Sequence, residues 1–129
     1  MPLMGMTKLP TTRHEILLLH NPKCSKSRAT LGLLEERGVA FQTRLYLENP
    51  LAEEELADLG RRLGKSALEF TRSKQAEFAK AALDASSTEA EVFAAMVAEP
   101  ILMERPILIR GDRATIGRPP ENVLLLLDD

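Results

Sequence analysis

The most restrictive feature of this sequence is a pair of short β-type segments separated by one amphipathic segment, all within residues 15–47. Glu15–Leu19 is an apolar run that ends at Asn21-Pro22, where the proline disfavours helix in the residue before it. From Ser25 the apolar residues fit a helix that stops at Gly38. Phe41–Leu47 then alternates with a period of two, which is typical of a strand. This order predicts a βαβ unit with parallel strands and a right-handed crossover.

The remainder of the chain is predicted to contain helices and one hairpin. Helices are expected at residues 50–64, 66–71, 75–83 and 88–99, and the last of these opens with the capping box Thr88-x-x-Glu91. Strands at residues 106–110 and 113–117 flank Gly111-Asp112, which suits a two-residue turn. Two prolines then open a final helix, Glu121–Leu127.

The order β-α-β, helical insert, β-β-α predicts an α/β fold of the thioredoxin-like type, with a four-stranded mixed sheet flanked by helices. Residues 1–12 have no periodic pattern, so we expect a disordered leader, followed at residues 13–129 by a single domain with a helical insertion at about 51–99. No apolar run is long enough to span a bilayer, and residues 1–12 lack the apolar stretch of a secretory signal. We therefore expect a cytoplasmic protein that does not bind membranes.

Basic residues cluster in two segments of a chain whose net charge is −2. Residues 20–28 carry Lys23, Lys26 and Arg28 with no acidic residue, and residues 105–118 carry four arginines with one aspartate, so each segment has a net charge of +3. The near-neutral total argues against nucleic-acid binding. Two of the four arginines, Arg110 and Arg113, are expected to face water beside the hairpin turn. If the two segments meet in space they form a site for a small anion, and otherwise they are solvated surface.

The only cysteine, Cys24, lies in the first basic segment, where the first predicted strand gives way to the helix. Backbone N–H groups at a helix start and neighbouring cations favour the thiolate, which is the nucleophilic form of cysteine. His20 could pair with this thiolate when protonated, and Ser27 could donate a hydrogen bond to the sulfur. We interpret Cys24 as a reactive thiol, with a buried inert cysteine as the alternative.

The cysteine count also restricts the chemistry. An intramolecular disulfide and an all-thiolate metal site are both excluded, and His14, His20 and Cys24 do not easily form a metal site. A dithiol oxidoreductase would need a second cysteine where the chain has Ser27, and a cysteine-phosphatase loop would need an arginine where it has Thr30. Any redox cycle through Cys24 therefore needs a resolving thiol from another molecule.

In several separated stretches the sequence resembles the glutathione- and glutaredoxin-coupled arsenate reductases, a family with a thioredoxin-like fold and a helical insertion. The matching stretches span roughly residues 15–127 and are His20-Asn21-Pro22-Lys23-Cys24-Ser25-Lys26-Ser27-Arg28, Leu45-Tyr46-Leu47-Glu48-Asn49-Pro50, Arg105-Pro106-Ile107 and Gly117-Arg118-Pro119. Lys23, Ser25 and Lys26 make the first stretch more basic than the Gly-Thr-type filling of well-characterised members.

The resemblance implies roles for individual residues and partners. Cys24 would attack arsenate and hold the arsenic covalently, and the oxyanion-binding arginines would be Arg72, Arg105 and Arg118. The residues that support the low thiol pKa and the anion pocket would be His20, Ser27 and Arg28, and Arg105-Pro106 would match the family's cis-proline position. Glutathione would be the co-substrate and glutaredoxin would resolve the mixed disulfide, with no bound cofactor or metal. The alternatives are a non-catalytic or regulatory monothiol module of the same fold, or a reductase that acts on a different oxyanion.

Overall fold

A four-stranded mixed sheet in the order β2-β1-β3-β4 is the centre of the computed structural model, which describes residues 9–127. Strands β1 (Ile16–His20) and β2 (Gln42–Leu45) are parallel, whereas β3 (Ile107–Arg110) pairs antiparallel with both β1 and β4 (Arg113–Ile116). The α/β class, the mixed four-stranded sheet and the thioredoxin-like arrangement predicted from the sequence are confirmed. Residues 1–8 of the predicted leader lie outside the described residues, and Leu9 and Pro10 are buried.

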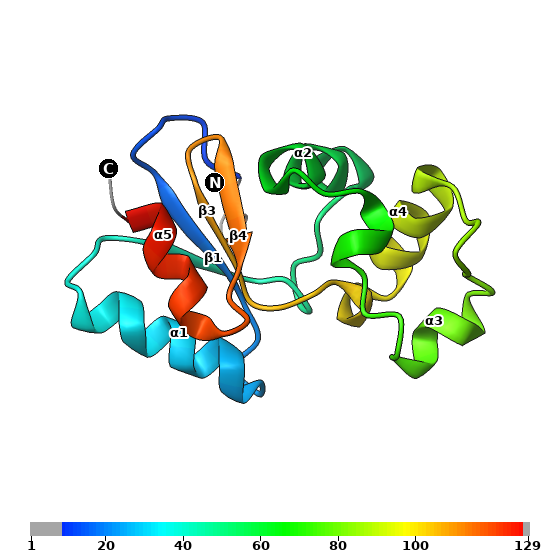
Figure 1. Cartoon of the computed structure of the whole chain (residues 1–129), viewed down its shortest axis with the longest axis horizontal. Coiled ribbons are helices and arrows are strands. Elements are labelled where there is room, and N and C mark those ends of the chain that lie inside the picture. The colour runs from blue at the N-terminus through cyan, green and yellow to red at the C-terminus, as the bar shows by residue number, and fades with distance from the viewer. Residues whose placement is uncertain (1–8, 128–129) are drawn as a thin grey trace. The chain divides into compact units, whose positions relative to one another are not determined.

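The crossover from β1 to β2 is the helix α1 (Ser25–Glu36). It ends where Gly38 adopts a φ of +66°, a left-handed conformation that costs glycine little. Figure 1 shows α1 and the last helix, α5 (Leu124–Leu127), on the same side of the sheet. Between these helices and the sheet lies an apolar core made of Leu18, Leu34, Leu108, Val123 and Leu126.

Three predicted boundaries are wrong by a few residues, each for a local reason. β1 starts at Ile16 because the backbone N–H of Glu15 is turned back to the Thr12 carbonyl. β2 ends at Leu45 because the Leu45 carbonyl accepts hydrogen bonds from Glu48 and Asn49, which starts a turn. The final helix is a 3-10 helix over Pro120–Val123 before it continues as α5.

The hairpin forms as predicted, with Gly111 at a φ of +58° in the turn between β3 and β4. Arg113 is exposed, as expected. Arg110 does not face water: it is half-buried, and its Nη1 donates to the Leu126 carbonyl of α5 at 2.8 Å. The carbonyls at a helix C-terminus lack partners within the helix, and the guanidinium of Arg110 supplies one of them with a donor.

The chain divides into two compact units. One consists of the described parts of Met1–Asn49 and Arg105–Asp129, and the other is Pro50–Glu104, which contains the predicted insertion. The elements of this second unit are α2 (Glu53–Leu63), a 3-10 helix Ala67–Phe70, α3 (Ala76–Lys80), α4 (Glu89–Ala98) and a 3-10 helix Pro100–Leu102.

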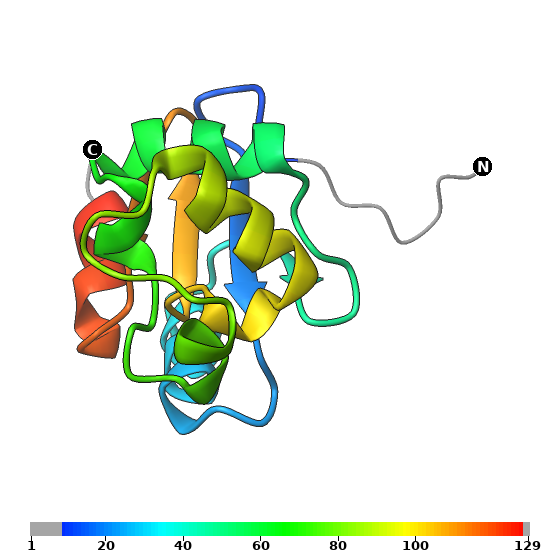
Figure 2. The same cartoon turned by 90° about the vertical axis from the view of Figure 1, so that its right-hand side faces the viewer.

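The second unit is held together by packing around α4. Figure 2 shows α2 and α4 next to each other, and the rings of Phe70 and Phe93 lie 6.3 Å apart between centroids. The predicted capping box is present, since Thr88 Oγ1 accepts from the Glu91 N–H at 3.1 Å. The helix expected over residues 75–83 is shorter, because Ala82 adopts a φ of +59° and ends it. Among residues 9–127, no helix has the length and apolar character needed to cross a membrane.

Candidate functional site

The sheet register brings the first basic segment next to the two ends of the second, which carry Arg105 and Arg118. Because β1 and β3 are antiparallel and Leu19 pairs with Ile107, the end of β1 lies beside the start of β3. Cys24 follows the end of β1, and Arg105 precedes the start of β3. The loop after β4 is bound to the same end of β3, since the Gly117 N–H donates to the Pro106 carbonyl at 2.8 Å.

Cys24 is the N-cap residue of α1 and only 8% exposed. Its backbone N–H donates to the Asn21 carbonyl at 3.0 Å, and its carbonyl accepts from the Arg28 N–H at 3.0 Å, so the residue is fixed on both sides. Its side chain makes no cap hydrogen bond of regular geometry.

The pKa of the Cys24 thiol is lowered by its surroundings. Burial by itself raises this pKa, but the backbone N–H of Ser27, the side chain of Arg105 and the backbone N–H of Lys26 all interact with the sulfur and lower it, as does the positive charge of Arg105. These groups outweigh the effect of burial. The lone cysteine therefore favours the nucleophilic thiolate more than an ordinary thiol does.

Arg105 has donors to spare beside this thiol. Its Nε and Nη1 are buried and have no hydrogen-bond partner among the described residues. Its backbone carbonyl accepts from Arg118 Nε at 2.9 Å, which holds these two of the four arginines of the second basic segment together. An arginine fork with unused donors next to a thiolate is suited to bind a tetrahedral oxyanion close to that nucleophile.

His20 and Ser27 contact each other rather than the sulfur. His20 Nδ1 lies 2.6 Å from Ser27 Oγ, which also accepts from the Asn21 N–H at 3.0 Å. The pKa of His20 is lowered, first by burial and second by the charge of Arg28, so its neutral form is favoured. Ser27 therefore acts on the Cys24 sulfur through its backbone N–H and not through its hydroxyl. The predicted pair of a protonated His20 with the Cys24 thiolate is not seen.

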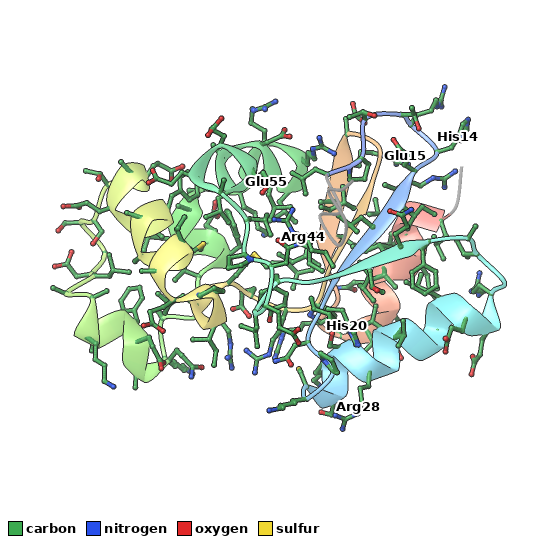
Figure 3. The ribbon with its side chains drawn as sticks, turned by 180° about the vertical axis from the view of Figure 1, so that it is seen from behind. His14, Glu15, His20, Arg28, Arg44 and Glu55 are labelled. Carbon is green, nitrogen blue, oxygen red and sulfur yellow. The ribbon has the colours of Figure 1, made fainter. Side chains whose placement is uncertain are left out.

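Arg28 is exposed, and its Nη1 donates to the Pro22 carbonyl at 2.9 Å. Figure 3 shows it at the start of α1, with His20 at the adjoining end of β1. Its charge acts on His20, whereas the charge that lowers the pKa of Cys24 comes from Arg105. Arg28 is therefore an exposed residue of this loop whose charge affects His20.

The peptide bond before Pro106 is cis, as the resemblance implies, and so is the bond before Pro119. Each of these prolines follows one of the two arginines of the site. Arg118 itself is exposed, and its carbonyl accepts from Asn122 Nδ2 at 3.0 Å.

Arg72 belongs to the second compact unit. Its Nη1 donates to Gln75 Oε1 at 2.7 Å, and its backbone N–H donates to the Leu102 carbonyl. The adjoining residues Thr71 and Met103 form an isolated antiparallel bridge. The role of Arg72 in oxyanion binding stays a prediction from the resemblance.

Two residues that sequence reasoning did not assign also shape the site. Asn21 holds the loop before Cys24, since its Oδ1 accepts from the Lys23 N–H at 3.0 Å and its carbonyl accepts from Cys24. An Asn-Pro pair after a strand signals such a turn. Gly117 packs so closely that a Cβ would lie 2.9 Å from both Pro106 Cγ and Thr30 Oγ1. No short-range pattern could have revealed that contact.

Within the described part of the chain, no three His, Cys, Asp or Glu side chains are grouped as metal ligands.

Comparisons with known proteins agree with this geometry. The family model described as the ArsC family matches residues 19–126. The chain is 47% identical over 112 residues to the uncharacterized protein YfgD of Escherichia coli (strain K12), covering 85% of this chain and 94% of that protein. It is 41% identical over 114 residues to a Haemophilus influenzae protein named arsenate reductase, covering 87% and 98% of the two chains.

A solved structure described as the arsenate reductase from Vibrio cholerae superposes with a TM-score of 0.84 and 41% identity, covering 89% of this chain and 99% of that one. The match therefore extends over both compact units and includes the cysteine loop and the two cis-proline segments. On this basis, the chain belongs to the ArsC family.

Proposed function

We propose that this protein reduces arsenate to arsenite, with Cys24 as the nucleophile and glutathione as the reductant. The observation that carries the proposal is the pairing of a thiol whose pKa is lowered with the buried, unpartnered Nε and Nη1 donors of Arg105. One group supplies the attacking sulfur and the other binds the oxyanion that is attacked. The relatives named arsenate reductase support arsenate as the substrate.

In the first step, Arg105 and Arg118 bind the oxygens of arsenate, and the Cys24 thiolate attacks the arsenic. A sulfur–arsenic bond forms, and one arsenate oxygen leaves as water after it takes up protons. Positive charge at the oxygens offsets the negative charge that builds up during this displacement. The contact between Arg118 Nε and the Arg105 carbonyl keeps the two arginines together for this purpose.

In the second step, the thiolate of glutathione attacks the sulfur of Cys24. A disulfide bond forms between the two sulfurs, the sulfur–arsenic bond breaks, and its electron pair stays on arsenic, which leaves as arsenite. The arsenic gains two electrons and the two sulfurs lose them. The thiolate of glutaredoxin then attacks the glutathione sulfur and releases the Cys24 thiolate, because the chain has no second cysteine to do so.

The test is arsenate turnover by the purified chain in the presence of glutathione, glutaredoxin and a coupled system that consumes glutathione disulfide. We expect turnover in the wild type and none in Cys24→Ser, since a serine hydroxyl does not ionise near neutral pH. Arg105→Gln should lower kcat/KM for arsenate by about 100-fold, in line with the loss of a charged oxyanion donor. Arg113→Gln, at an exposed position of the hairpin, serves as the control and should keep wild-type turnover.

Three results would each contradict a part of this proposal. Turnover that survives in Cys24→Ser would exclude Cys24 as the nucleophile. A wild-type chain that forms a mixed disulfide with glutathione but consumes no thiol in response to arsenate would instead support the monothiol regulatory module. A chain that turns over with another oxyanion but not with arsenate would keep the mechanism and change the substrate.

A further inference from the structure

Two lysines next to the thiol have no role in the mechanism above. Lys23 and Lys26 are both exposed. Their backbones are nevertheless fixed at the site: the Lys23 N–H donates to Asn21 Oδ1 at 3.0 Å, and the Lys26 N–H interacts with the sulfur of Cys24. Both side chains therefore start at the thiol and extend into solvent.

Neither lysine is neutralised by the protein. Arg61 and Arg62 each form an ion pair with Asp58, but within residues 9–127 no acidic side chain pairs with Lys23 or Lys26. Residues 20–28 contain no acidic residue at all. An unscreened positive charge close to a reacting sulfur raises the local concentration of anions and speeds their encounter.

In the proposed mechanism the oxyanion is bound without these lysines, because Arg105, whose side chain interacts with the thiol, keeps two buried donors without a partner. The reductant is different, since it must reach the sulfur from solvent and, in the case of glutathione, carries two carboxylates. We propose that Lys23 and Lys26 form a basic rim that selects thiol reductants bearing carboxylates over neutral or cationic thiols. This inference rests on the proposed function, in which a glutathionyl group becomes bonded to Cys24.

The test measures formation of a disulfide bond between Cys24 and a small thiol, in the absence of arsenate. Reduced protein is mixed with glutathione disulfide, with hydroxyethyl disulfide, which is neutral, or with cystamine, which is cationic. The Cys24 thiolate attacks one sulfur, a new disulfide bond to Sγ forms, the old disulfide bond breaks, and the second half leaves as a thiolate with the electron pair. Mass spectrometry of the quenched protein gives the second-order rate constant for each reagent.

The informative quantity is the ratio of the rate constant for glutathione disulfide to that for hydroxyethyl disulfide. Any change in the thiol pKa affects both reagents alike, so it cancels. In the double variant Lys23→Gln/Lys26→Gln we expect this ratio to fall by about threefold at physiological salt, and the relative rate with cystamine to rise. In the wild type, high salt should reduce the ratio toward that of the variant.

The matched control is Arg13→Gln/Arg37→Gln, which removes the same charge from exposed positions of the same unit. Arg37 is the C-cap of α1 and lies about 20 Å along the helix from Cys24, well over twice the screening length of about 8 Å in physiological salt. Arg13 precedes His14, which Figure 3 shows at the end of β1 opposite to His20. This variant should keep the wild-type ratio.

Three results would overturn the proposal: an unchanged ratio in the lysine variant, an equal loss with all three disulfides, or an equal loss in the arginine control. The outcome is separate from that of the proposed function. A chain that shows the charge preference but does not turn over arsenate would retain the basic rim and lose the reductase assignment, and the converse result would reject the rim alone.

Discussion

At the scale of single residues, the pKa of Cys24 results from opposing effects. Burial raises the pKa of the thiol, whereas the Ser27 N–H, the Arg105 side chain and the Lys26 N–H lower it, with a net downward shift. Two of these groups belong to the start of α1 and exist wherever that helix forms. Arg105 comes from a distant part of the sequence, so its contribution can be removed by itself.

We expect Arg105→Gln to raise the pKa of Cys24, because both a hydrogen bond and a positive charge are lost while burial remains. Arg105→Lys should lie between the wild type and Arg105→Gln, since it keeps the charge without the fork. The measurement is the rate of Cys24 alkylation by iodoacetamide, a neutral reagent, as a function of pH. Identical pH profiles for the wild type and Arg105→Gln would show that Arg105 does not act on the thiol.

His20 provides a pH-dependent contribution to stability. Burial and Arg28 hold its pKa below the ordinary value of 6.5, so the unfolded state takes up the proton first as pH falls. Because the unfolded state then binds more protons than the folded state, the free energy of unfolding should decrease as pH drops below about 6.5. The carboxylates with lowered pKa values, Glu15, Glu69 and Asp84, act only at lower pH.

The substitution His20→Asn should flatten this dependence between about pH 6.5 and 5, because asparagine does not titrate and can occupy the position of Nδ1 beside Ser27. Urea denaturation at a series of pH values gives the slope, with His14→Asn, at an exposed position, as the control. An unchanged slope in His20→Asn would assign the acid sensitivity to other groups.

At the scale of elements, the site depends on how α1 packs against the loop that follows β4. Thr30 of α1 is fully buried, and its Oγ1 donates to the Lys26 carbonyl at 3.0 Å while it packs against Gly117. This contact holds the first turn of α1, with Cys24 at its cap, against the cis-proline segments. Space at Gly117 is therefore critical, although its φ is not in the left-handed region.

Gly117→Ala should destabilise the fold by about 1–3 kcal/mol, because the new Cβ would overlap Pro106 and Thr30. Gly32→Ala is the matched control within α1: a Cβ there meets nothing within 4 Å, and alanine favours a helix over glycine by about 0.5–1 kcal/mol. Chemical denaturation should show changes of opposite sign. Destabilisation of similar size in both variants would remove the packing argument.

At the scale of the whole molecule, basic residues lie close to Cys24 although the net charge of the chain is −2. The antiparallel pairing of β1 with β3 and the β3–β4 hairpin bring the first basic segment to the same end of the sheet as Arg105 and Arg118, whereas Arg110 and Arg113 lie at the hairpin turn at the other end. Arsenate, phosphate or sulfate bound beside Cys24 should block the thiol. We therefore expect each of these anions to slow the alkylation of Cys24, and Arg105→Gln to weaken the protection.

The same alkylation assay tests the predicted role of Arg72, which belongs to the second compact unit. If the role that the resemblance implies for Arg72 holds, Arg72→Gln weakens protection by arsenate, as Arg105→Gln does. Lys74→Gln removes an equal charge from an exposed position two residues later and is the control. Equal protection in Arg72→Gln and the wild type would exclude Arg72 from anion binding.

Much of the fold followed from patterns of short range. The period-two and helical segments predicted β1, α1 and β2 in order, glycines marked the ends of α1 and α2, and the capping box marked the start of α4. Errors occurred where a local hydrogen bond competed with the pattern. Such a bond ends β2 at Leu45, and a left-handed Ala82 ends α3 early.

The sequence by itself determined that Cys24 is the only cysteine, that it lies at a predicted helix start among basic residues, and that any redox cycle through it needs an external thiol. Only the tertiary structure decided that Arg105 reaches the sulfur, that the Ser27 hydroxyl is used by His20 and Asn21, and that Arg110 caps α5. The physical reason is range. Helix starts and caps depend on residues three or four apart, whereas the Cys24–Arg105 contact depends on the pairing of β1 with β3, strands that lie more than 80 residues apart in the chain.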